Sequence, residues 1–326
     1  MDALSEVLKA VKLESAFFFN AEFSAPWCFR SPDSCKLAPY IHQSSGHVIV
    51  YHLLIEGKAY ARLEDERLTI HPGDVLIFPH GDSHCLESGP SPNIVNGEGE
   101  LQRILSQGLK VTRMGGKGEV CRFVCGFMVC EPRLSKVFLA GLPAMFKVNI
   151  RQEESGQWLE DSIRHSMAEA ATRGAGSEAV LAKLSEALFA ETLRRYMSRL
   201  PERQTGWLAG ARDPEVGKVL ALMHRQPAAR WTVAGLAHEA GVSRSVLADR
   251  FRQYLGEPPV AYLTRWRLQL GAQMLSSTSH SVAQIASKVG YDSEPAFNRA
   301  FKRMFGNPPA RYRNQRKPRQ SQAAQA

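Results

Sequence analysis

The stretch VAQIASKVGYDSEPAFNRAFKRMFGNPPARYR, residues 282–313, has the pattern of two short helices joined by a tight turn. Gly290 stands at the turn, where a backbone with positive φ is expected. Ser293 is a natural N-cap for the following helix, predicted over Glu294–Phe305. This order is typical of a helix-turn-helix unit, whose second helix can enter the major groove of DNA.

The same pattern occurs once more, about 50 residues earlier. VAGLA at 233–237 corresponds to VAQIA at 282–286, and Gly241 to Gly290, at an offset of 49 residues. Beyond the turn the offset is 50, and it relates Phe251 to Phe301, Gly256 to Gly306, Pro258-Pro259 to Pro308-Pro309 and Tyr262 to Tyr312. A second unit is therefore predicted, with Ser243 as the N-cap of a helix over Arg244–Leu255. A long helix over Pro259–Leu275 would join the two units and could present both second helices to successive major grooves, if they lie about 34 Å apart.

Each second helix has an apolar stripe that is predicted to be buried, while its other positions point outward. The stripe consists of Val246, Leu247 and Phe251 in the first unit and of Ala296, Phe297 and Phe301 in the second.

Positive charge is concentrated in the same part of the chain. The whole sequence has 41 Lys and Arg against 32 Asp and Glu, a formal net charge of +9. From Asp213 onward there are 17 Lys and Arg against 7 Asp and Glu, which leaves 24 against 25 in the residues before it. A basic segment beside a nearly neutral one suggests a polyanion such as nucleic acid as its partner, although a solvated basic surface gives the same count.

The first 150 residues read mostly as short strands separated by Gly and Pro turns, which favours a barrel or a sandwich. The predicted strands are Ala16–Phe19, His47–Leu54, Ala59–Leu63, Leu68–Ile70, Val75–Phe78 and Cys121–Val129, after one short helix over Leu4–Val11. Residues 87–118, rich in Ser, Gly, Pro and Asn, read as a long irregular insertion. From Trp158 the period becomes helical, and Ser177 is the expected N-cap of a second helix in this segment.

At 326 residues the chain is longer than one core usually supports. The expected division is a β-rich domain over 1–150, a helical segment over 151–205, a domain with both helix-turn-helix units over 213–316, and a basic, polar tail over 317–326. No apolar run is long enough to cross a bilayer, and no secretory signal is found at the N-terminus. The six cysteines have no zinc-finger spacing, so reduced thiols and a cytoplasmic location are expected.

Residues 213–313 resemble the DNA-binding domain of the AraC/XylS family of bacterial transcription regulators, and the run from Gly290 to Arg313 is similar to that family's signature almost throughout. The upstream part resembles the cupin-type sensor domain that is attached to one branch of the family. The apolar stripes of the helices at 158–199 suit either dimer contact or packing on the barrel. The resemblance implies an α+β multidomain protein with an N-terminal cupin-like β-barrel, a helical linker or dimerisation segment and a C-terminal all-α domain. It also implies double-stranded DNA, a small-molecule effector, a second copy of the chain and RNA polymerase as partners, and no membrane.

Carried over residue by residue, the resemblance assigns two sets of DNA contacts. The residues that would face base edges are Ser245, Ala248 and Asp249 in the first unit and Glu294, Pro295, Ala296 and Arg299 in the second. Arg299 is the strongest of these, because a guanidinium can contact guanine O6 and N7 at once. Asp249 departs from the expected chemistry, since an acid must accept from cytosine N4 or repel phosphate. The residues that would contact phosphates are Arg244, Arg252, Lys302, Arg303 and Arg311.

The front half carries one specific motif. Gly73-x5-Pro79-x-Gly81-x2-His84 matches the second motif of cupin barrels, but the first motif is only half present, because His52 fits while Leu54 replaces its second histidine. Two histidines are too few for a metal-dependent oxygenase. Cys125, on a late strand, could complete a zinc site with His52 and His84; the alternative is that the histidines bond to backbone or to an effector, and no cofactor is required.

Three functions remain open at this stage. The first is a regulator in which the cupin-like domain senses a small molecule or oligomerises. The second is a metal-binding cupin enzyme with an appended DNA-binding domain, which the missing ligands disfavour. The third is an architectural DNA binder, which would show little sequence preference.

Overall fold

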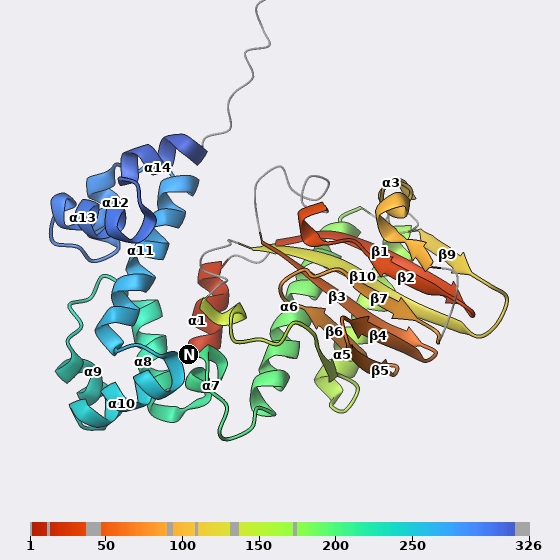
Figure 1. Ribbon diagram of the computed structural model, residues 1–326, viewed down its shortest axis with the longest axis horizontal. Coiled ribbons are helices and arrows are strands. Elements are labelled where there is room, and N and C mark those ends of the chain that lie inside the picture. Colours follow the sequence, from red (N-terminus) through yellow and green to blue (C-terminus); the bar gives the residue numbers. More distant parts are fainter. Residues whose placement is uncertain are drawn as a thin grey trace, which may run out of the picture. The chain divides into compact units, whose positions relative to one another are not determined.

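The computed structural model describes residues 2–11, 14–36, 47–89, 94–107, 110–130, 137–171 and 175–316. The chain folds into two compact units (Figure 1). One, which we call the β-rich unit, is Val11–Glu202. The other, the helical unit, combines Arg203–Ala326 with Met1–Ala10. The overall α+β class and the order of the two domain types are as predicted.

The β-rich unit is built from two sheets. The six-stranded sheet has the order β11 (Phe146–Asn149), β6 (Asp74–Phe78), β3 (His47–Glu56), β10 (Val120–Cys130), β1 (Glu14–Ser24) and β9 (Val111–Gly115). The five-stranded sheet has the order β5 (Glu66–Ile70), β4 (Ala59–Leu63), β7 (His84–Glu87), β2 (Cys28–Ser31) and β8 (Ile94–Asn96). Within the residues described, the strands do not close into a barrel, so the prediction is corrected from a barrel to two sheets.

A core of aliphatic and aromatic side chains from both sheets fills the β-rich unit. Its centre is aromatic: the rings of Phe23 and Trp27 stack with centroids 4.3 Å apart, and Phe123 packs edge-on against both. Alternation along the strands explains this, because every second residue of β1 from Phe19 to Phe23 points into the same core.

The segment predicted as an irregular insertion is largely regular. Helix α3 (Gly97–Gln107) lies between β8 and β9, and each of these two strands pairs in parallel with a strand far from it in sequence. The sequence prediction was wrong here because Gly, Ser and Asn signal turns locally, whereas the pairing of β9 with β1 is a long-range contact.

Helices α5 (Glu154–Ala171) and α6 (Ser177–Ser198) belong to the β-rich unit. The six-stranded sheet meets α6 through a buried hydrogen bond of 2.8 Å from the Tyr51 hydroxyl to Ser185 Oγ. Gly126 makes room for the Tyr51 ring, since a Cβ there would lie 2.4 Å from its oxygen. The N-cap of α6 is Gly176, with φ 78°, and Ser177 is the buried first residue of the helix, which corrects the predicted cap.

The helical unit contains α7 (Trp207–Arg212), α8 (Pro214–Arg225), α9 (Val233–Ala240), α10 (Arg244–Leu255), α11 (Pro259–Ser277), α12 (Val282–Lys288), α13 (Glu294–Phe305) and α14 (Pro309–Arg316). Residues 3–10 of α1 (Ala3–Val11) also belong here, although the sequence placed them in the front domain. Leu4 and Val7 of α1 are buried, and Gln273 of α11 donates from Nε2 to the carbonyl oxygen of Ala10 at 3.1 Å. Among the residues described, no helix is long and apolar enough to cross a membrane.

Candidate functional site

The two helix-turn-helix units are α9–α10 and α12–α13, and their turns have the predicted geometry. Gly241 and Gly290 both have positive φ, 75° and 86°. Ser243 Oγ accepts from the Val246 amide at 3.2 Å, and Ser293 Oγ accepts from the Ala296 amide at 3.4 Å, so both serines cap their recognition helices as predicted. These caps satisfy backbone groups that a helix start otherwise leaves free.

The first helix of each unit is capped as well. Thr232 Oγ1 accepts from the Gly235 amide at 3.0 Å at the start of α9. At the start of α12, Ser281 and Gln284 form a capping box, in which each side chain bonds to the backbone of the other. Each of the four helices thus begins at a side-chain cap that its own local sequence supplies.

The predicted buried stripes are confirmed at four of their six positions, and Ala296 is only half-buried. Leu247, Phe251, Phe297 and Phe301 have no exposed surface. Val246, however, is 42% exposed. Val246 lies about 100° around the helix from Leu247 and still further from Phe251, so it falls outside the face that these two residues bury.

The residues predicted to face bases lie on the outer surface of the recognition helices. Ser245 and Asp249 of α10 and Glu294, Pro295 and Arg299 of α13 are exposed, whereas Ala248 and Ala296 are half-buried. Within the described part of the chain Arg299 has no ion-pair partner, so its guanidinium is available to a ligand. Asp249 instead pairs with Arg252, with 3.4 Å between Oδ1 and Nη1.

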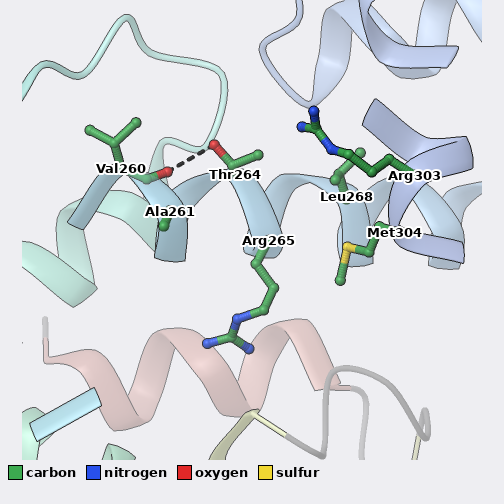
Figure 2. A pocket seen from close by; sticks show the side chains of 7 residues that line it. All are labelled: Val260, Ala261, Thr264, Arg265, Leu268, Arg303 and Met304. Carbon is green, nitrogen blue, oxygen red and sulfur yellow. Dashed lines mark hydrogen bonds between the residues drawn. The ribbon is translucent and has the colours of Figure 1, made fainter. Parts of the chain in front are cut away.

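The residues predicted to contact phosphates, Arg244, Arg252, Lys302, Arg303 and Arg311, are all exposed. Arg303 has a distinct setting, because it lines an open groove of about 430 Å³ between α11 and α13 (Figure 2). Val260, Thr264 and Met304 line the same groove, while Arg265 extends from α11 toward α1 and forms an ion pair with Glu257. Arg303 therefore projects beside α11 from the C-terminal half of α13, away from the half that a recognition helix presents to bases.

A buried polar cluster that the sequence did not predict supports the first unit. The Tyr262 hydroxyl of α11 accepts from Trp207 Nε1 at 2.8 Å and lies 2.7 Å from His224 Nε2, to which it can donate. Burial, together with the nearby charge of Arg265, lowers the pKa of His224 to about 3, so the imidazole is neutral and accepts. The repeat places Tyr312 at the equivalent position of the second unit, where it is also buried.

In the β-rich unit the structure brings together His52, His84 and Cys125, as the sequence suggested. His52 on β3 is the register partner of Cys125 on β10, and its Nδ1 lies 2.9 Å from Cys125 Sγ. Its Nε2 lies 2.8 Å from Nε2 of His84 on β7. His84 Nδ1 lies 2.8 Å from the carbonyl oxygen of Asp82.

The hydrogen-bond directions of this cluster follow from its last member. A carbonyl oxygen only accepts, so His84 donates from Nδ1 and a neutral His84 accepts at Nε2. His52 then donates from Nε2 and accepts at Nδ1 from the Cys125 thiol. Burial lowers the pKa of His52 well below its usual value and that of His84 to about 4, and burial raises the pKa of the Cys125 thiol, so every member is neutral near pH 7.

This geometry does not fit a three-ligand zinc site. Cys125 lies on the Nδ1 side of the His52 ring and His84 on the Nε2 side, so the sulfur and the two imidazoles do not converge on one point. Over the ranges that the structure describes, no group of three or more His, Cys, Asp and Glu side chains could hold a metal ion. As arranged, the cluster ties β3, β7 and β10 together.

Two capped helix-turn-helix units in a basic unit define a DNA-binding protein of the helix-turn-helix class. Comparison with known proteins agrees: residues 2–198 match the family described as Cupin, and residues 236–315 match the family described as Helix-turn-helix domain.

Relatives extend over nearly the whole chain. A putative AraC-like transcription regulator of Streptomyces lividans is 32% identical, with 96% of this chain and 98% of the relative covered. The HTH-type transcriptional regulator AlkR of Acinetobacter baylyi is 26% identical, with 97% and 100% covered. The RCS-specific HTH-type transcriptional activator RclR of Escherichia coli is 29% identical, with 96% and 97% covered. The chain belongs to the AraC/XylS family of DNA-binding transcription regulators, and it is a regulator rather than an enzyme.

Proposed function

We propose that this regulator reads one promoter sequence with α10 and α13 in successive major grooves, and that the β-rich unit controls this binding. The proposal is supported by the duplication of the helix-turn-helix unit, each helix of which has a capped start. In the second unit the recognition helix exposes Arg299, which has no ion-pair partner among the described residues. This supports specific readout because base edges are read by side chains that are free to pair with them.

Arg299 is the residue to test first. A bidentate contact with guanine discriminates against the wrong base by about 1–3 kcal/mol, or roughly 5- to 150-fold in affinity. Arg299→Ala should therefore lose preference at one base pair of a selected site and keep most of its binding to random DNA. The matched control is Lys302→Ala, one turn further along α13, which should weaken binding to all sequences alike.

The experiment is a selection of bound DNA from a random pool, repeated with both variants. Equal losses of Arg299→Ala on the selected site and on random DNA would contradict the assignment. A wild-type protein that selects no sequence at moderate salt would contradict the proposed function as a whole.

We propose a smaller reading role for α10. Its candidate base contacts are Ser245, Ala248 and Asp249, of which Asp249 is already paired with Arg252. An acid on a recognition helix can accept from cytosine N4 but repels phosphate. Asp249→Asn should change the base selected under α10 and raise the affinity for random DNA, and Ser245→Ala serves as the small, uncharged comparison.

Control through the β-rich unit requires two arrangements of the protein with different affinities for an effector or a second copy. We propose that a small molecule or dimer formation supplies this difference, with α5 and α6 as the dimer surface. Trp158 of α5 is 65% exposed and Val180 of α6 is 53% exposed, so each helix offers an apolar side chain that a second copy of the chain could cover. Light scattering of the wild type and of Trp158→Ser with Val180→Ser, with and without DNA, tests the dimer.

We further propose RNA polymerase as a partner and a cytoplasmic location, because a bacterial regulator of this family meets promoter DNA and the polymerase there. For the cupin-type unit, we propose that it works without a cofactor and that its histidine cluster is structural. Zinc is the alternative, and metal analysis decides it: about one equivalent retained after purification, and lost in His84→Gln, would favour zinc.

A further inference from the structure

A polar cleft of about 450 Å³ lies between the loop that precedes the first helix-turn-helix unit and the second unit. One wall comes from the loop between α8 and α9, through Ala228 and Arg230. The other wall comes from the second unit: exposed residues of α12, including Ser287, and the turn that leads to Ser293 and Glu294 at the start of α13. In a helix-turn-helix motif the first helix crosses the DNA backbone and the start of the second helix contacts the bases. The cleft, which lies beside α12 and the start of α13, therefore opens where the sugar-phosphate backbone of bound DNA would pass.

The loop that carries Arg230 is held in place by the helix between the units. Arg267 of α11 donates from Nε to the carbonyl oxygen of Pro227 at 2.6 Å and from Nη2 to that of Ala229 at 2.7 Å. The turn of the second unit presses against this loop at Gly290, where a Cβ would lie 2.8 Å from Ala228 Cα. Arg230 thus projects from a backbone that is fixed on both sides.

Arg230 itself is almost free of the protein. Its side chain is 92% exposed and forms an ion pair with Asp292, in which Arg230 Nη2 lies 3.2 Å from Asp292 Oδ1. The side chain of Asp292 is itself 86% exposed. An ion pair that exposed contributes little to folding. Two acids, Asp292 and Glu294, line the cleft at the start of α13. Their carboxylates would repel a DNA phosphate there unless a cationic side chain lay beside it.

We propose that this cleft seats a backbone phosphate of the bound duplex and that Arg230 contacts it, while Asp292 holds the guanidinium in position in free protein. Arg230 itself lies outside both helix-turn-helix motifs, in the loop before α9. The proposal rests on the proposed function in that the duplex must already engage α13. Arg267 acts as a positioning residue for it. The contact is to the backbone, so it adds affinity and salt dependence without selecting a base.

The test measures affinity against salt concentration for the full chain, on a selected site and on a random duplex of equal length. Each phosphate neutralised contributes about 0.9 to the slope of log K against log salt. Arg230→Ala should lower that slope by about 0.9 on both duplexes. Arg164→Ala removes the same charge from α5 and should leave the slope unchanged. Lys302→Ala is the positive control: it should lower the slope and so show that the loss of one backbone contact can be measured.

Asp292→Asn and the double variant separate a phosphate contact from simple neutralisation of the acid. If Arg230 contacts phosphate, Asp292→Asn binds both duplexes at least as tightly as wild type, and Arg230→Ala with Asp292→Asn keeps the reduced slope. Recovery of the wild-type slope in the double variant would overturn the proposal, as would an unchanged slope in Arg230→Ala while Lys302→Ala lowers it. If the wild-type protein shows no preference for the selected site over the random duplex, the proposed function is overturned instead.

Discussion

Replacing Gly290 with alanine tests how the two helix-turn-helix units are held together. Gly290 and Gly241 are equivalent in the repeat, and both have positive φ, 86° and 75°. Alanine in a left-handed conformation costs about 1–2 kcal/mol, and this cost is the same at both positions. Their surroundings differ, because a Cβ at Gly241 would have no heavy atom within 4 Å.

At Gly290 the added methyl group would lie 2.8 Å from Ala228 Cα and 2.9 Å from Arg267 Cζ. The first of these is a backbone atom that cannot rotate away, and Arg267 is held by two carbonyl oxygens. Overpacking of this kind costs about 1–3 kcal/mol. Gly290→Ala should therefore destabilise the protein by roughly 2–5 kcal/mol, against roughly 1–2 kcal/mol for Gly241→Ala.

Two assays check this prediction. Urea unfolding gives the free energies of the two variants, and binding to sites whose half-sites are moved apart by one or two base pairs reports the spacing of the recognition helices. Gly290→Ala should lose its preference for the native spacing, since relief of the clash moves the second unit away from the loop at residues 227–230. Equal destabilisation of the two variants, or an unchanged spacing preference in Gly290→Ala, would refute the reasoning.

Three further predictions concern stability. Because burial lowers the pKa of His84 from 6.5 to about 4, the unfolded chain binds a proton that the folded protein does not. The stability that neutral His84 contributes is complete above pH 6.5 and should fall by about 3 kcal/mol as the pH approaches 4; burial also lowers the pKa of His52 and His224, which add to the loss, and a flat urea midpoint over that range would contradict this. Ser281→Ala removes the capping box of α12 and should cost about 1 kcal/mol in the same assay. The side chain of Arg195 is 2% exposed and donates to Glu191 and to the carbonyl oxygen of Ile150. Arg195→Met should therefore lower the free energy of unfolding by roughly 3–5 kcal/mol, whereas Arg194→Met, at a side chain that is 55% exposed, should lower it by less than about 1 kcal/mol. Similar effects of the two variants would show that burial is not the cause.

The elements that could be predicted from the residues alone are those whose signals are local and repeated. Each helix-turn-helix unit has a turn glycine and a capping serine that act within a few residues of their own position. Both signals occur in both copies of the repeat, as Gly241 and Ser243 and as Gly290 and Ser293. The same holds for the recognition helices and for the exposed Arg299, because helical period and cap together fix which side chains face outward. Even the meeting of His52, His84 and Cys125 was predictable in outline from motif and strand position.

Features that depend on contacts between distant residues became visible only in the folded protein. The packing of the strands and helices set each of them. It turned the histidine cluster into a chain of hydrogen bonds, since the side of the His52 ring that meets Cys125 depends on how β3, β7 and β10 pack. It assigned most of α1 to the helical unit, and it placed Arg230 beside Asp292, which is 62 residues away. The physical reason is the same in each case: local propensity carries no information about which surfaces of two distant segments will exclude water together.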